Sequence, residues 1–102
     1  MPRAVIVVKT KSDLDSINVA ITQWDQMAFE CGRRNIEIVD RILTTGGIKD
    51  IQKKIEKLDK LKQFDYVVLY SPNQFADKRQ DYIDFVGYLD NFFGVKVVAI
   101  RS

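Results

Sequence analysis

The residue types that could carry chemistry gather where the first apolar segment of the chain ends. Lys9 and Lys11 flank Thr10, and Ser12 follows directly. A lysine with a lowered pKa can accept the proton of a serine hydroxyl and so make that oxygen a nucleophile. The sequence favours a structural interpretation, because serine commonly caps a helix and lysines that end a strand are commonly solvated. Catalysis by Ser12 with Lys9 and Lys11 stays open as the alternative.

A second group of small and hydroxyl residues runs from Thr44 to Gly47. The backbone amides of such a loop can bind a phosphate at the start of the helix that follows. The loop has neither the GxGxxG nor the GxxxxGK[ST] pattern of nucleotide-binding proteins. We therefore favour a tight turn that needs a positive φ at Gly46 or Gly47.

The composition excludes several classes of enzyme and site. Histidine is absent and Cys31 is the only cysteine. Ser-His-Asp and Cys-His catalysis cannot be built from this chain, and an internal disulfide is impossible. We expect no metal site and no cofactor. The 16 basic and 14 acidic residues give a net charge of +2, which is too balanced to predict binding to nucleic acid.

Length and hydropathy predict one globular domain over residues 1–102. The longest apolar run, residues 4–8, is far shorter than the roughly 20 residues that span a bilayer. The N-terminal residues lack the pattern of a secretory signal peptide. We expect a cytoplasmic protein that does not contact a membrane.

Apolar patterning predicts strands and helices in strict alternation. Residues 3–10 (RAVIVVKT) form a nearly continuous β-branched run, typical of a strand buried on both faces. Further strands are predicted over residues 36–43, 64–70 and 95–100, and helices from Ser12 to Gly32, over 48–62 and over 76–93. This alternation predicts a three-layer α/β fold, whose mainly parallel four-stranded sheet has the order 2-1-3-4 and helices on both faces.

The spacing of apolar residues also predicts which helical faces are buried. The first helix is expected to pack through a stripe at three- and four-residue spacing, which consists of Leu14, Ile17, Ile21, Trp24, Ala28 and Cys31. The third helix is expected to pack through a stripe that includes Leu89 and Phe92. Lysines crowd the second helix between Lys49 and Lys62, and its outer face is expected to be solvated.

Functional groups in a parallel sheet gather at the carboxyl ends of the strands. In this chain those ends are residues 9–12, 43–47 and 71–76. We expect any site to lie in these loops.

Read in order, these segments resemble the catalytic domain of serine recombinases, the resolvase/invertase family, over nearly the whole chain. Residues 7–12 (VVKTKS) resemble the end of the family's first strand with its Tyr-x-Arg-Val-Ser-Thr type motif. Residues 64–78 (FDYVVLYSPNQFADK) resemble its third strand and Leu-Asp-Arg-Leu-x-Arg segment. Residues 35–40, 46–58 and 94–99 resemble its second strand, its glycine-containing loop with the next helix, and its fourth strand.

The resemblance implies a degenerate active site. The family's nucleophilic serine falls on Lys11, and the arginine before it falls on Lys9. Its later aspartate and two arginines fall on Asn73, Gln74 and Asp77. Serine recombinases attack a DNA phosphodiester while guanidinium groups stabilise the charge of the transition state. A carboxylate in place of an arginine would repel that substrate.

We therefore expect a resolvase-like domain linked to DNA recombination that is catalytically inactive and acts through contact with another protein. The expected partner is a second copy or a recombinase, with DNA bound weakly or only through that partner. Self-association is also expected from aromatic residues of the third helix, namely Tyr82, Tyr88 and Phe93.

Two other functions stay open. One is an active DNA strand-cleaving recombinase domain that uses Ser12, and the other is a small-molecule-binding α/β module at the strand-end clefts. Active family members continue into a dimerising helix and a DNA-binding domain, so we do not expect these 102 residues alone to recombine DNA.

Overall fold

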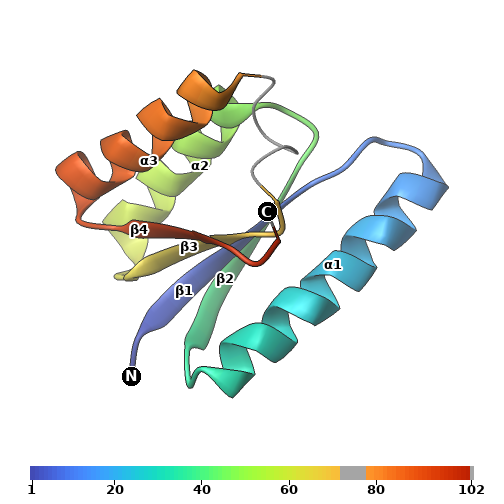
Figure 1. The fold of residues 1–102 in the computed structure, drawn as a ribbon, viewed down its shortest axis with the longest axis horizontal. Coiled ribbons are helices and arrows are strands. Elements are labelled where there is room, and N and C mark those ends of the chain that lie inside the picture. The colour runs from blue at the N-terminus through green and yellow to red at the C-terminus, as the bar shows by residue number, and fades with distance from the viewer. Residues whose placement is uncertain (72–77, 102) are drawn as a thin grey trace.

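The computed structural model describes residues 1–71 and 78–101 and shows a three-layer α/β fold (Figure 1). The elements in chain order are β1 (Arg3–Lys9), α1 (Leu14–Arg33), β2 (Glu37–Thr44), α2 (Ile48–Leu61), β3 (Tyr66–Leu69), α3 (Arg79–Phe93) and β4 (Lys96–Ala99). All strand pairs are parallel, and the order across the sheet is β2-β1-β3-β4. The fold class and strand order predicted from the sequence are confirmed.

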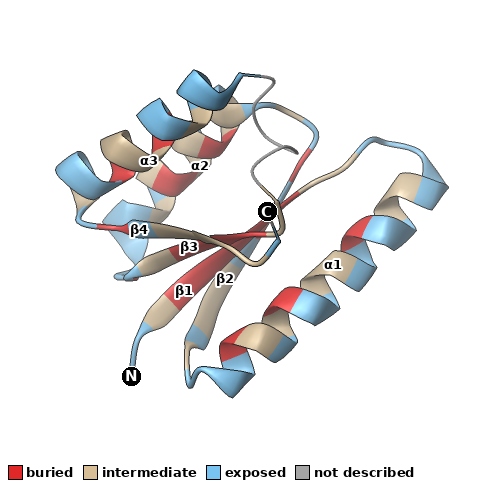
Figure 2. Ribbon diagram, viewed as in Figure 1, coloured by how far each residue is buried: buried red, intermediate tan, exposed pale blue. Residues whose placement is uncertain are grey.

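The strand β1 is the centre of the molecule. It pairs with β2 on one side and with β3 on the other, and residues 4–8 are completely buried (Figure 2). Because successive side chains of a strand point to opposite faces, β1 supplies both hydrophobic cores. Val5 and Val7 belong to the core on one face, and Ala4, Ile6 and Val8 belong to the core on the other.

One face of the sheet is covered by two helices. The helices α2 and α3 pack side by side, with α2 against β2 and α3 against β4 (Figure 1). They bury Ile51, Ile55, Phe85 and Leu89 against the sheet. This face is therefore covered across its full width.

The opposite face carries α1, which packs against β1 and β2. In the part of the chain that the structure describes, no helix covers the half of this face formed by β3 and β4. On that half Val68 is buried, whereas Tyr66, Tyr70, Val98 and Ile100 are only partly buried. The sheet is thus fully covered on one face and half-covered on the other.

This uneven cover changes which side of α1 is buried. The residues of α1 that reach the core are Ala20, Met27 and Cys31. Leu14 and Ile21 of the predicted stripe are 72% and 47% exposed. Cys31 of that stripe is buried and Trp24 and Ala28 pack against the core, so the prediction is confirmed for the second half of α1 and wrong for Leu14 and Ile21. The reason is that α1 lies over two strands without a neighbouring helix and buries only a narrow strip.

Within residues 1–71 and 78–101, the structure contains no helix that is long and apolar enough to cross a membrane.

Two residues of α3 test this pattern of burial. Leu89 is fully buried and Phe92 is 73% exposed, although the sequence places both in one apolar stripe. We expect Leu89→Ala to lower the free energy of unfolding by about 2–5 kcal/mol, because it leaves a cavity in the core. We expect Phe92→Ala to cost less than about 1 kcal/mol. Urea denaturation followed by circular dichroism measures both, and equal losses would contradict the placement of α3.

Candidate functional site

The sheet has a topological switch point at the carboxyl end of β1. The chain leaves β1 toward α1 on one face, and it leaves β2 and β3 toward helices on the opposite face. The strands β1 and β3 are neighbours, so the connections diverge between them. In open α/β sheets the crevice at such a switch point is the usual place for a ligand.

A cavity of about 440 Å³ opens beside the end of β1. Residues 9–11 line one side of it, and Asp15, Ser16, Val19, Ala20 and Gln23 of α1 line the other. Small-molecule sites typically measure about 300–1,000 Å³ and combine apolar walls with a few polar groups. The size and mixed lining of this cavity fit that description, and it lies on the α1 side of the end of β1.

The structure brings two of the sequence-predicted candidates to this cavity. Lys9 is half-buried at the end of β1, opposite Thr44 in the register with β2, and Lys11 is exposed in the loop. Both line the cavity, whereas Ser12 does not. Among the described residues, neither lysine ammonium forms a hydrogen bond or an ion pair. The positive charges at this strand end are therefore available to a ligand.

The prediction that Ser12 caps α1 was wrong, because Asp13 holds the cap. The Asp13 carboxylate accepts hydrogen bonds from the Ser16 backbone N–H at 2.8 Å and from the Ser16 hydroxyl at 2.9 Å. These bonds, with the backbone one contributing most, hold the pKa of Asp13 below its usual value. Asp and Ser are equally good caps, but a carboxylate also suits the positive end of the helix. Ser12 is left exposed, one residue before the cap.

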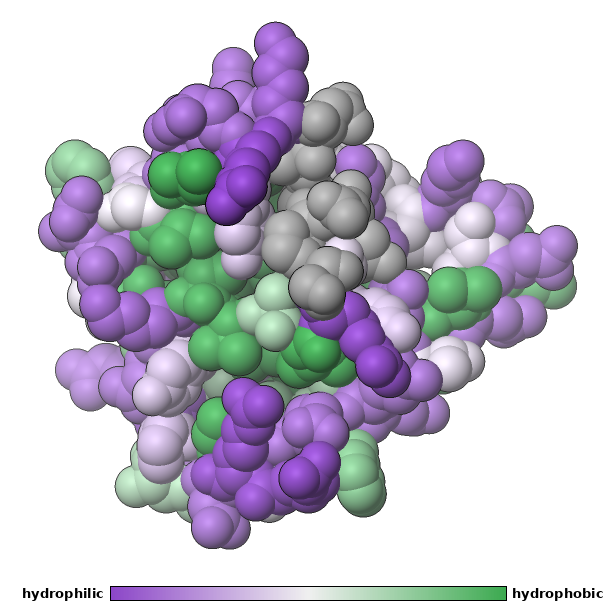
Figure 3. Space-filling view, viewed as in Figure 1, coloured by the Kyte–Doolittle hydropathy of each residue, from purple (hydrophilic) through white to green (hydrophobic). Residues whose placement is uncertain are grey.

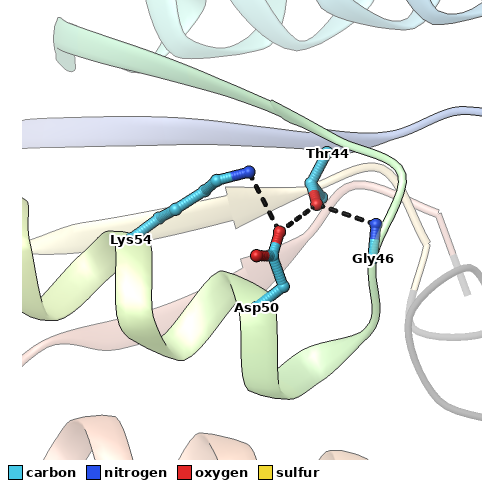
Figure 4. Close-up of polar contacts among 4 residues, drawn as sticks. All are labelled: Thr44, Gly46, Asp50 and Lys54. Carbon is cyan, nitrogen blue, oxygen red and sulfur yellow. Dashed lines mark hydrogen bonds and ion pairs between the residues drawn. The ribbon is translucent and has the colours of Figure 1, made fainter.

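The end of β2 carries a polar network that is closed within itself (Figure 4). The buried Thr44 hydroxyl donates to the Asp50 carboxylate at 2.5 Å and accepts from the Gly46 N–H at 2.9 Å. Lys54 donates to the same carboxylate oxygen at 2.9 Å. The hydrogen bond from Thr44, followed by that from Lys54, lowers the pKa of Asp50. The network fastens the loop after β2 to the first turns of α2.

This network argues against a phosphate site in the glycine loop. The Gly46 amide already has the Thr44 oxygen as its acceptor, and the Asp50 carboxylate would repel an anion. The expected positive φ was also wrong, since among the described residues only Asn35 and Gly94 have one. Gly46 is needed for a different reason, because a Cβ there would lie 2.7 Å from the Asp50 Cβ.

The structure does not describe the remaining site positions that the resemblance implies. Asn73, Gln74 and Asp77 lie outside the described residues. The site that the structure does show consists of Lys9 and Lys11 beside the α1 wall. Its apolar wall was not predicted, because it depends on the rotation of α1 relative to the sheet.

Comparisons with protein-family models, with curated proteins and with solved structures found no match. The resemblance to serine recombinases rests on the quoted segments and their order, and it stays a prediction.

The two glycines of the β2–α2 loop form a matched pair for testing this network. We expect Gly46→Ala to destabilise the fold by about 1–3 kcal/mol, because its Cβ meets a Cβ that is fixed to the α2 backbone. A Cβ at Gly47 meets no atom within 4 Å. We expect Gly47→Ala to change stability by less than about 1 kcal/mol, since the weaker cap and the stiffer unfolded chain oppose each other. Thermal and urea unfolding measure both, and equal effects would count against the close approach.

Proposed function

We propose that this chain is a cytoplasmic, serine-recombinase-like domain that binds another protein and does not itself catalyse strand exchange. The observation that carries the proposal is the half-covered face of the sheet. An apolar surface that is open and rimmed by polar side chains is typical of a protein-interaction site.

The open surface runs from β4 to the second half of α1. Figure 3 has the same orientation as Figure 1, and it shows hydrophobic side chains gathered at the place that β4 occupies in Figure 1. A cavity of about 480 Å³ lies between α1 and the end of β4, and Phe29, Ile100 and Arg101 are among the residues that line it. Phe29 is 67% exposed although it is a large aromatic residue. We call this region the β4–α1 surface.

The charges at the β4–α1 surface favour a second copy of the chain as the partner. Asp25 of α1 and Arg101 after β4 line the same cavity. In a dimer with two-fold symmetry each surface meets itself, so an acidic group of one copy can face a basic group of the other. Apolar side chains at the centre, here Phe29 and Ile100, would supply most of the binding free energy.

The aromatic residues first expected to drive self-association have another role. Tyr82, Tyr88 and Phe93 pack against the core under α2 and α3. The Tyr88 hydroxyl donates to Glu56 at 2.5 Å, and this hydrogen bond raises the pKa of Tyr88. Their sequence positions therefore do not support an interface on α3, and the proposal rests on the β4–α1 surface instead.

Two exposed phenylalanines on different helices test this proposal. We expect the chain to sediment as a monomer–dimer equilibrium and Phe29→Glu to weaken the dimer by at least about tenfold, because it places a charge in an apolar contact. Phe92→Glu, on α3, is the control and should leave the equilibrium unchanged. Analytical ultracentrifugation over a wide concentration range measures all three. A chain that stays monomeric throughout, or one that both substitutions affect equally, would overturn binding through this surface.

Several features support the proposal that the chain does not cleave DNA. Ser12 lies outside the cavity that Lys9 and Lys11 line, so the candidate base and nucleophile do not share a pocket. Lys54 and Lys62 are paired with Asp50 and Asp40, which reduces the free positive charge around α2. Any affinity for DNA should be weak and should fall steeply with salt.

A denaturing quench after incubation with supercoiled and nicked DNA tests for catalysis. We expect no covalent protein–DNA adduct and no difference between the chain and Ser12→Ala. A serine without guanidinium groups to stabilise the phosphorane-like charge loses on the order of a hundredfold or more in rate for each missing donor. An adduct that disappears in Ser12→Ala would favour the strand-cleaving alternative and overturn this part of the proposal.

A further inference from the structure

We propose that the cavity beside β1 is a binding site for a small organic anion, in which a phosphate or carboxylate group is joined to an apolar body. This site is separate from the β4–α1 surface and goes beyond the proposed protein-binding function. It rests on the position of the cavity, on its unpaired charges and on its apolar wall.

The charge of the cavity favours an anion. Lys9 and Lys11 bring two positive groups to its rim, and Asp15 brings one negative group. Among the described residues, neither lysine forms an ion pair that a ligand would have to displace, although the Asp13 carboxylate interacts with Lys11 at longer range. Opposite charges within about 4 Å attract appreciably at a partly shielded protein surface. A phosphate or carboxylate placed between the two ammonium groups is the complementary ligand group.

The helix dipole of α1 contributes little to this site. Asp13 already accepts the Ser16 N–H, and its carboxylate lies at the positive end of the helix. An anion in the cavity must therefore be held by the lysine side chains. This assignment makes the lysines the residues to substitute.

The wall of the cavity is partly apolar and therefore favours a ligand that has an apolar part as well as a charge. Val19 is exposed although it is apolar, and Ala20 is buried next to it. A free inorganic anion keeps its hydration and gains nothing from such a wall. A ligand with an apolar body covers Val19 and removes apolar surface from water. The structure thus favours an amphipathic organic anion over inorganic phosphate.

The test uses four probes and the whole chain, observed by ¹H–¹⁵N correlation spectra. The probes are 1-naphthyl phosphate, 1-naphthoate, 1-naphthol and inorganic phosphate, which separate the two anionic groups from the apolar body. We expect saturable shifts at the amides of Thr10, Val19 and Ala20 with one or both naphthyl anions. Naphthol and inorganic phosphate should bind at least about tenfold more weakly, since each lacks one of the two interactions.

Three lysine variants locate the site. Lys11→Ala should weaken binding of the naphthyl anion at least about fivefold through the loss of one ammonium group. Lys60→Ala removes the same charge from an exposed position of α2 and should leave the affinity unchanged. Lys11→Arg keeps the charge and should retain most of the binding.

Three results would overturn the site. They are the absence of saturable shifts at millimolar concentrations of every naphthyl anion, inorganic phosphate binding as well as the naphthyl anions, and Lys60→Ala weakening binding as much as Lys11→Ala. None of these results bears on the dimer, which is measured separately at Phe29.

Discussion

The structure depends on the burial of β1 on both of its faces. Residues 4–8 are fully buried, and they can be so only if strands flank β1 on both sides and helices cover both faces. This one strand links the two hydrophobic cores. It also places Lys9, at its carboxyl end, in the middle of the sheet edge, where connections to opposite faces diverge. The position of the candidate site thus follows from the same constraint that holds the fold together.

The second determinant is the unequal cover of the sheet. In the described part of the chain two helices cover one face, and α1 packs mainly against β1 and β2 on the other. The open flank of α1 then borders both proposed sites, with Val19 at the cavity beside β1 and Phe29 at the β4–α1 surface. Apolar residues that a second neighbouring helix would bury are exposed here. Both proposals therefore have a common physical origin, although each can fail alone.

The ends of the neighbouring strands β1 and β2 differ in how their polar groups are used. At the end of β2, Thr44, Asp50 and Lys54 satisfy one another and fix the loop. At the end of β1, Lys9 and Lys11 form no hydrogen bond or ion pair with a described residue, and only the more distant charge of Asp13 acts on Lys11. A closed network stabilises structure, whereas unpaired charges beside a cavity are available for a ligand. A ligand is therefore expected at the end of β1 and not at the loop between β2 and α2.

The sequence by itself determined the alternation of strands and helices, the double burial of β1 and the strand order, because apolar periodicity records the exposure of each residue along one element. It determined the buried face of α1 only in part: Cys31 is buried as predicted, but Ala20 and Met27 are buried in place of Leu14 and Ile21, since rotation about the helix axis depends on which strands lie below. It also did not show why position 46 needs a glycine, because the reason is the close approach of the Asp50 side chain on the following helix. Both depend on contacts between elements, and the cavity beside β1 exists only once those contacts have formed.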